Sequence, residues 1–289
     1  MKVFKFGGAS VKDAAGIKNV ASIIQKYGEK DLVVVVSATG KTTNALEVVI
    51  KSYFDNTDAK AAFDLVKKNH HSICMDLFGN EQHEVFDKLQ NIYAEVDWQL
   101  EEDRKESYNY VYDQIVSQGE LISSVILSAY LNEVGVNNTL LDVRDILKTD
   151  NNFREANINW TKTTENVTAF TDAATNLVIT QGFVGCTDDN ESTTLGREGS
   201  DYTAAIFANL LNAESVTIWK DVEGVMNADP KAFPDATLIS ELSFDEVIEM
   251  AYYGAQVIHS KTIKPLQNKG IPLQVKCFLD PSLPGTVIH

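Results

Sequence analysis

Cysteine, proline and basic residues are all scarce in this chain of 289 residues. Its three cysteines lie far apart and form no paired motif, which argues against disulfides and against a structural zinc site. Lys and Arg number 25 against 41 Asp and Glu, so a net charge of −16 disfavours nucleic acid or an anionic membrane as a partner. The sequence also lacks a charged leader and any apolar run that approaches a membrane span. These absences predict a reduced, cytoplasmic compartment.

What is present is an alternation of short apolar runs and helical patterns, with 44% hydrophobic residues overall. Residues 32–36 form an uninterrupted apolar run, typical of a strand covered on both faces. Apolar residues recur at helical spacing from about residue 59 to 130. The pattern predicts an α/β fold with a mainly parallel sheet and a helical insertion over about residues 45–135.

Three stretches are harder to interpret. We expect a strand over residues 139–143 and a hairpin in the polar segment 151–160. After the last predicted strand, residues 273–278, the segment with Asp280-Pro and Leu283-Pro-Gly is typical of a domain edge or linker.

The first ten residues combine a short strand that carries Lys5, a turn at Gly7 and Gly8, and a helical run from Asp13. Adjacent glycines let backbone N–H groups approach phosphate oxygens, and a following helix adds the positive end of its dipole. Lys5 then lies where an ammonium could meet a transferring phosphoryl group. A simple tight turn explains the same residues, so the motif alone does not decide.

The stretch Ser37-Ala-Thr-Gly-Lys-Thr-Thr43 resembles the end of a P-loop between a strand and a helix. The first glycine of that motif would fall on Val35, so the phosphate cradle is incomplete. We therefore reject a P-loop but keep these hydroxyl residues as candidates for lining a ligand site.

Two further stretches carry charged residues in small-residue surroundings. Glu120 shares a helix face with Ser117, Ser123 and Ser124, which leaves room around its carboxylate, although a solvated glutamate is the simpler interpretation. Arg197 is flanked by glycines in a loop, which suits a grip on a carboxylate through two parallel hydrogen bonds.

Gly199-Ser-Asp201 opens a helix that we expect from Tyr202, with Ser200 or Asp201 as its cap. At a phosphate site, Asp201 can instead orient a lysine or a metal. The loop from Asp221 follows the predicted strand 216–220, and ligands of open parallel sheets bind at such strand ends. This loop is a candidate for holding a nucleotide.

Together the motifs resemble those of the aspartate kinases, which belong to the amino-acid kinase family. The motifs that carry the resemblance, in the same order and spacing, are Lys-Phe-Gly-Gly-Ala-Ser-Val (5 to 11), Gln-Gly-Glu-Leu (118 to 121), Thr-Thr-Leu-Gly-Arg-Glu-Gly-Ser-Asp-Tyr (193 to 202), Lys-Asp-Val-Glu-Gly-Val (220 to 225) and Gly-Ala-Gln-Val-Ile-His (254 to 259). They cover essentially the whole chain. The resemblance implies a three-layer α/β/α sandwich, with an acid-substrate lobe over about residues 1–190 and a nucleotide-binding lobe over about 191–289.

The resemblance implies transfer of the γ-phosphate of ATP, with Mg²⁺, to the side-chain carboxylate of L-aspartate, the first step of lysine, threonine and methionine biosynthesis. Lys5 and Asp201 would be catalytic. Glu120 would bind the substrate ammonium and Arg197 its α-carboxylate. The other implied substrate-binding residues are Ser37, Thr43, Phe183 and Ser200. The implied nucleotide-binding residues are Gly7, Gly8, Lys220, Asp221, Met226, Lys231 and Gln256.

Several positions depart from the common family pattern. The family usually has Thr at the position of Ala9, Gly at that of Glu198, Thr at that of Lys220 and Pro at that of Ser260. Gln256 stands where the family places a second phosphate-contacting lysine, so Lys220, Lys261 or Lys264 takes its place or phosphate binding is weaker. We expect Lys220 to take part of the role.

Other interpretations stay open: a kinase of N-acetylglutamate, glutamate or a similar acid, or a catalytically weak amino-acid or nucleotide-binding protein. The family often forms dimers, so a homodimer is possible. Related kinases usually continue into ACT regulatory domains, which the sequence does not include before it ends at His289. We therefore expect no feedback inhibition of this chain by lysine or threonine.

Overall fold

The computed structural model describes residues 1–28, 31–101, 106–171, 177–228, 232–255 and 258–289. Within these residues an eight-stranded sheet forms the middle layer, in the order β3-β4-β2-β1-β7-β9-β10-β8. Its strands are β1 (Lys2–Phe6), β2 (Leu32–Val36), β3 (Thr139–Leu141), β4 (Leu177–Gln181), β7 (Ser215–Lys220), β8 (Glu241–Leu242), β9 (Leu273–Cys277) and β10 (Thr286–Ile288).

The central strands are parallel and in register. Phe6 pairs with Val36 on one side and with Trp219 on the other, so β1, β2 and β7 end together at one edge of the sheet. β4 ends at the same edge, since Val36 pairs with Gln181. β10 runs antiparallel to β9, which makes the sheet mixed at its far end. The loops after four parallel strands therefore leave the sheet side by side.

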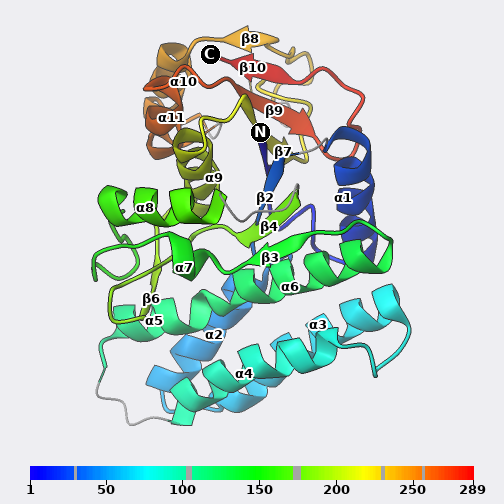
Figure 1. Cartoon of the computed structure of the whole chain (residues 1–289), viewed down its shortest axis with the longest axis vertical. Coiled ribbons are helices and arrows are strands. Elements are labelled where there is room, and N and C mark those ends of the chain that lie inside the picture. The colour runs from blue at the N-terminus through cyan, green and yellow to red at the C-terminus, as the bar shows by residue number, and fades with distance from the viewer. Residues whose placement is uncertain (29–30, 102–105, 172–176, 229–231, 256–257) are drawn as a thin grey trace.

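Helices from the first half of the chain cover one face and extend away from the sheet at one end of the molecule (Figure 1). They are α1 (Ala14–Tyr27), α2 (Thr42–Phe54), α3 (Ala59–Phe78), α4 (Val85–Glu101), α5 (Tyr108–Val116) and α6 (Gln118–Glu133). Alternate strand residues such as Phe4, Phe6 and Val34 pack against them in one buried cluster. The predicted helical insertion thus forms a compact helical layer.

The opposite face is covered by helices from the second half of the chain. They are α7 (Val143–Ile146), α8 (Trp160–Thr171), α9 (Gly199–Leu210), α10 (Phe244–Tyr252) and α11 (Ser260–Gln267). The other set of strand residues, among them Val3, Val33 and Val35, packs against these helices in a second cluster. Because the strands are apolar on both faces, the predicted three-layer α/β/α sandwich is confirmed.

Helix α6 is buried almost all round, unlike the amphipathic helices outside it. It lies between the sheet and the outer helices, and Figure 1 shows it running beneath the sheet alongside the α3–α4 pair. A helix that is apolar on every side belongs in the core. Its first turn therefore carries Glu120 into a buried position, at the edge where the parallel strands end.

Two local predictions were wrong, and a third was wrong at one end. β3 stops at Leu141, because the carboxylate of Asp142 accepts a hydrogen bond from the backbone N–H of Arg144 and starts α7. Residues 151–160 form no hairpin; a single bridge joins Thr149 to Ile158, and α8 begins at Trp160. The supposed terminal linker instead ends in strand β10, which pairs with β9.

A small antiparallel pair, β5 (Val184–Cys186) and β6 (Ser192–Thr194), stands apart from the main sheet. The three cysteines are buried and unpaired, as the spacing predicted. None of the described helices has the length and apolar character needed to cross a membrane.

Candidate active site

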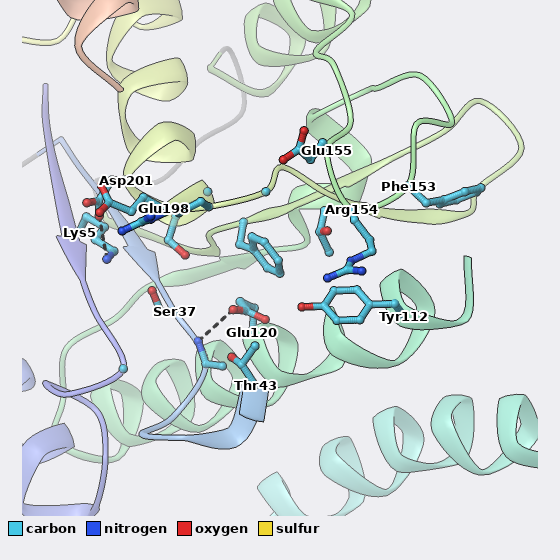
Figure 2. Close-up of a pocket in the computed structure, with 18 of the residues that line it drawn as sticks. Lys5, Ser37, Thr43, Tyr112, Glu120, Phe153, Arg154, Glu155, Glu198 and Asp201 are labelled. Atoms are coloured by element: carbon cyan, nitrogen blue, oxygen red, sulfur yellow. Dashed lines mark hydrogen bonds and ion pairs between the residues drawn. The ribbon is translucent and has the colours of Figure 1, made fainter. Parts of the chain in front are cut away.

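A cavity of about 720 Å³ opens where the parallel strands end, between the start of α6 and the start of α9 (Figure 2). It brings together residues that are up to 196 positions apart in the chain, counted from Lys5 to Asp201 (201 − 5). The predicted site residues that line it are Lys5, Gly8, Ser37, Thr43, Glu120, Phe183, Arg197, Ser200 and Asp201. Residues of both expected lobes thus share one cavity.

Lys5 and Asp201 form an ion pair at one end of this cavity. The Nζ atom of Lys5 lies 2.7 Å from Oδ1 of Asp201, and the two side chains are 12% and 4% exposed. Lys5 points from β1 towards the face that α9 covers, and Asp201 lies in the first turn of α9. Burial keeps the pair from being screened by water and salt. The pair therefore holds a lysine ammonium in a fixed position beside the cavity.

The expected capping role of Ser200 or Asp201 was wrong. Helix α9 begins at Gly199, earlier than expected, and its N-cap is Glu198, a residue with φ 54° whose side chain makes no capping bond. The Oε2 of Glu198 instead accepts a hydrogen bond of 2.9 Å from the backbone N–H of His259. Glu198 thus connects the loop before α9 to the start of α11, and Asp201 is left to pair with Lys5.

The glycine turn after β1 is tightly packed against the loop after β2. A Cβ atom on Gly8 would lie 2.7 Å from the carbonyl oxygen of Ala38 and 2.8 Å from that of Gly40. The backbone N–H of Gly40 donates to the carbonyl of Gly8 at 3.0 Å. A Cβ on Gly7 would be 3.4 Å from Nζ of Lys5, so Gly7 leaves the lysine room.

The start of α9 borders the cavity, whereas the start of α1 does not. Helix α1 begins only at Ala14, and Asp13 caps it by accepting a 2.8 Å hydrogen bond from the backbone N–H of Gly16. In contrast, Gly199 and Ser200 in the uncapped first turn of α9 line the cavity. The positive end of a helix dipole favours anions. The start of α9, unlike that of α1, is therefore placed to supply the expected dipole contribution.

Glu120 is buried, with an exposed fraction of 3%, so the solvated interpretation of this residue was wrong. Its Oε1 accepts a 3.3 Å hydrogen bond from the backbone N–H of Ala38, while its buried Oε2 has no partner among the described residues. Burial raises the pKa of Glu120 to about 8, and the hydrogen bond from Ala38 and the charge of Lys5 oppose the shift. A cation bound beside this carboxylate would restore its charge.

The serines near Glu120 have structural roles that the sequence pattern did not indicate. The hydroxyl of Ser123 donates to the carbonyl of Ser37 at 2.7 Å, and the side-chain amide of Gln181 donates to the hydroxyl of Ser124 at 2.6 Å. They fasten α6 to the ends of β2 and β4 instead of opening space around the carboxylate. Glu120 is thereby fixed relative to the sheet edge.

Arg197 lies in an exposed loop between β6 and α9 and lines the cavity. No carboxylate of the described residues forms an ion pair with its guanidinium. Phe183, in a left-handed conformation with φ 69°, packs so closely on Gly199 that a Cβ there would lie 2.6 Å from its ring. The ring therefore forms a fixed apolar part of the cavity wall.

Arg154 and Tyr112 also line the cavity, and the sequence analysis did not identify either (Figure 2). The guanidinium carbon of Arg154 lies 4.3 Å from the centre of the Tyr112 ring. These two residues are 42 positions apart (154 − 112), so no local pattern could have paired them. Glu155, beside Arg154, is a third unforeseen residue of the rim.

The predicted nucleotide-binding residues lie partly outside this cavity. Lys220 ends β7, Asp221 follows it in an exposed turn, and Met226 pairs with Leu238 in an antiparallel bridge. None of these three lines the cavity. Lys231 and Gln256 fall outside the described residues, so their predicted roles rest on the sequence alone.

The fold is that of a three-layer α/β protein, and its cavity is lined by side chains of both signs of charge. Residues 1–277 match the family model described as the amino acid kinase family. The match extends over most of the sequence, so the chain belongs to the amino acid kinase family.

Comparison with known proteins gives more specific similarities. The chain is 33% identical over 301 residues to bifunctional aspartokinase/homoserine dehydrogenase 1 of Arabidopsis thaliana, covering 99% of this chain and 32% of that protein. It is 32% identical over 303 residues to aspartokinase 2 of the same plant, covering 99% of this chain and 54% of the other. Both relatives are chloroplastic proteins by name.

Solved structures of aspartokinases are also similar to this chain. The chain superposes on E. coli aspartokinase III in complex with aspartate and ADP with a TM-score of 0.87 and 31% identity, over 100% of this chain and 64% of that one. For the aspartate kinase of Clostridium acetobutylicum the TM-score is 0.83 and the identity 26%, over 100% and 63%. The chain therefore spans between about a third and two thirds of the length of these proteins.

Proposed function

We propose that this chain transfers the γ-phosphoryl group of ATP to the side-chain carboxylate of L-aspartate, giving 4-phospho-L-aspartate. The observation that carries the proposal is the buried carboxylate of Glu120 in one cavity with Arg197 and the Lys5–Asp201 pair. An amino acid with two carboxylates needs one acidic and at least one strongly basic partner. The cavity offers both, beside a fixed ammonium that suits a phosphate.

The relatives support this choice of reaction. Those described above are aspartokinases by name, and the E. coli enzyme was captured with aspartate and ADP. On this basis the product feeds amino-acid biosynthesis, at the step before lysine, threonine and methionine diverge. Because those proteins are longer than this chain, their activity supports the proposal for this chain without deciding it.

Each charged group has a part in the proposed reaction. Glu120 receives the substrate ammonium, which keeps its own carboxylate ionised, and Arg197 receives the α-carboxylate. Lys5 neutralises charge that develops on the moving phosphoryl group, and Asp201 keeps its ammonium in place. Phosphoryl transfer needs little covalent help, so positioning and charge stabilisation account for most of the rate.

Smaller residues complete the substrate site in this proposal. Ser37 and Thr43 follow β2 and open α2, where their hydroxyls line the cavity. Phe183 and Ser200 line it from the side of α9. Gly7 and Gly8 let the backbone approach the phosphates, next to the uncapped start of α9.

The nucleotide occupies the neighbouring edge of the sheet in this proposal, at the end of β7, where Lys220, Asp221 and Met226 lie. Lys231 and Gln256 are assigned to the same site by their place in the motifs. Mg²⁺, when bound together with ATP, would neutralise charge on the phosphates. It is commonly held by phosphates, waters and one or two carboxylates. The described residues contain no group of three acidic, histidine or cysteine side chains that could form a larger cage.

Two alternatives remain to be tested against aspartate. N-Acetylglutamate carries a neutral amide in place of the ammonium, so it would leave the buried Glu120 without a positive partner. Glutamate keeps the ammonium but is one methylene longer. The other alternative to an aspartate kinase is a binding protein with little catalysis. It stays open because Gln256 stands where the family places a phosphate-contacting lysine.

The test is ATP turnover by the purified chain with Mg²⁺ and L-aspartate, in which hydroxylamine traps the acyl phosphate as a hydroxamate. N-Acetylglutamate and glutamate are run in parallel. Aspartate-dependent hydroxamate that is lost in Glu120→Ala and Arg197→Ala supports the proposal. Binding of ATP or aspartate without turnover supports the binding-protein alternative. Turnover with another acid but not with aspartate shows that this other acid is the substrate.

The division into an acid lobe, residues 1–190, and a nucleotide lobe, residues 191–289, is retained as part of the proposal, with the cavity at their boundary. A homodimer also stays a prediction, and light scattering on the purified chain tests it directly.

A further inference from the structure

We propose that Arg154 binds the α-carboxylate of the amino-acid substrate together with Arg197, as a second guanidinium of the acid site. This inference rests on the proposed function and names a recognition residue for that same substrate. It depends on three observations: how the backbone of Arg154 is held, what its side chain stacks on, and which charges the cavity leaves uncompensated.

The backbone of Arg154 is held in an unusual conformation. Its φ of 74° lies in the left-handed region that favours glycine. Its N–H donates to Oδ2 of Asp113 at 2.8 Å, and Asp113 is fully buried. A strained backbone persists only where its surroundings over-determine it, and such positions gather at functional sites. The left-handed turn directs the side chain over the cavity rather than away from it (Figure 2).

Asp113 holds a second segment of the site at the same time. Its Oδ2 also accepts from the backbone N–H of Thr194 at 2.9 Å, and its Oδ1 accepts from the Thr194 hydroxyl at 2.7 Å. Thr194 ends β6, three residues before Arg197. One buried carboxylate therefore fixes both segments that present the two arginines. Asp113 is a positioning residue in this arrangement.

The side chain of Arg154 stacks on an aromatic ring that is itself anchored. Its guanidinium lies 4.3 Å from the centre of the Tyr112 ring and 5.9 Å from that of Tyr108. The Tyr112 hydroxyl donates to Oε1 of Glu47 at 2.9 Å, which fixes the ring. Stacking occupies the flat face of a guanidinium and leaves its N–H donors, which lie in the plane, free for a carboxylate.

The charges around the cavity leave Arg154 available to a ligand. Lys5 and Asp201 compensate each other, and the Glu198 carboxylate is engaged by the backbone of His259. In the part of the chain that the structure describes, no carboxylate forms an ion pair with the side chain of Arg154. A substrate carboxylate supplies an ion-pair partner for this guanidinium.

The position of Arg154 identifies which carboxylate it binds. Figure 2 shows Lys5 and Arg154 on opposite sides of Glu120. The carboxylate that accepts the phosphoryl group must approach Lys5. If the ammonium is at Glu120, the α-carboxylate is the one that extends towards Arg154 and Tyr112.

Arg154→Gly is the sharpest test, because glycine adopts φ 74° without strain and the turn keeps its backbone. We expect Km for L-aspartate to rise about tenfold to a hundredfold, as for the loss of a charge-assisted hydrogen-bonded pair, with kcat within about threefold of the parent value. Lys60→Ala, which removes one exposed lysine that pairs with Glu101, controls for net charge and leaves both constants unchanged.

L-Aspartic acid α-amide separates substrate contact from a general effect on the fold. It lacks the α-carboxylate charge and keeps the ammonium and the acceptor carboxylate. Arg154→Gly leaves its Km unchanged if Arg154 binds the α-carboxylate. An equal rise for both substrates, or no rise for L-aspartate, overturns the inference.

Failure of the proposed function gives a different result. The parent chain then shows no aspartate-dependent turnover at all, and Arg154 is tested by calorimetric titration with L-aspartate. Affinity at least tenfold weaker in Arg154→Gly than in the parent supports the inference. Equal affinity, or no binding by the parent, overturns it.

Discussion

Lys5 and Asp201 meet across two layers of the fold, with 2.7 Å between the lysine Nζ and the aspartate Oδ1. The lysine comes from the central strand β1 and the aspartate from the first turn of α9. Such a pair costs solvation of both charges and favours stability only weakly. The rigidity of the pair matters more for the proposed reaction than for stability, because a fixed ammonium needs no reorganisation when charge develops on a phosphoryl group.

We therefore expect Lys5→Ala to lower kcat by about 10²–10³, the usual effect of removing one preorganised charge donor. The hydroxamate assay with saturating ATP and aspartate measures this. Asp201→Asn is the matched comparison, since it keeps the lysine but removes the partner that positions it, and its loss should be smaller. A kcat for Lys5→Ala within threefold of the parent would contradict the assigned role.

Glu120 carries a second prediction, on pH and stability. Its pKa of about 8 lies above the ordinary value of 4.5, so between these pH values the folded state holds a proton that the unfolded chain has released. The free energy of unfolding therefore falls as pH rises through this window. Gln carries no titrating proton and avoids the cost of a buried charge. Glu120→Gln should gain stability over the parent from pH 5 to pH 8.

The measurement is thermal unfolding of both proteins at pH 5 and pH 8 without substrate. The difference in Tm between Glu120→Gln and the parent should be larger at pH 8, while the same variant loses turnover with aspartate. A Tm difference that does not grow with pH would show that the carboxylate is not held protonated by burial. Gain of stability with loss of activity is typical of residues kept for function.

Much of the architecture could be predicted because local and global signals agree in it. The apolar run of β2 and the helical spacing of α3 and α4 each reflect one environment, so pattern alone indicates the element. Strand β3 was predicted two residues too long, because a single residue, Asp142, could cap a helix as easily as continue a strand. Strand β10 was missed because its three residues, Thr286–Ile288, form a strand only by pairing with β9.

The cavity residues likewise divide into those that a local motif reveals and those that depend on distant parts of the chain. Lys5, Glu120 and Arg197 were identified because each lies in a recognisable motif. Arg154 lies in no motif, and its place depends on Asp113, which is 41 positions away (154 − 113) and acts through a backbone N–H. The burial of Glu120 was likewise missed, because it depends on α6 being covered on all sides by elements distant in sequence.

A third prediction concerns the glycine turn. Gly8→Ala places a Cβ atom 2.7 Å from the carbonyl oxygen of Ala38, and backbone must move to admit it. We expect a loss of about 1–3 kcal/mol in the free energy of unfolding, together with reduced kcat. Gly7→Ala is the control, because its Cβ meets only the flexible end of Lys5 at 3.4 Å. Urea unfolding of the two variants measures the difference, and equal losses would contradict the packing argument.

The last prediction tests whether Lys220 makes up for the glutamine at position 256. Lys220 ends β7, next to the loop assigned to the nucleotide, at a position where the resemblance to the aspartate kinases implies Thr. A lysine ammonium near phosphates contributes through charge rather than shape, so Lys220→Ala should raise Km for ATP, lower kcat, or both, and leave Km for aspartate unchanged. Adding Gln256→Lys to this variant should restore ATP use, since it returns the positive charge to the usual place. Initial rates at varied ATP measure the effect for each single variant and the double variant. If Lys220→Ala changes neither kcat nor Km for ATP, Lys220 has no part in phosphate binding, and Lys261→Ala and Lys264→Ala are the next variants to measure.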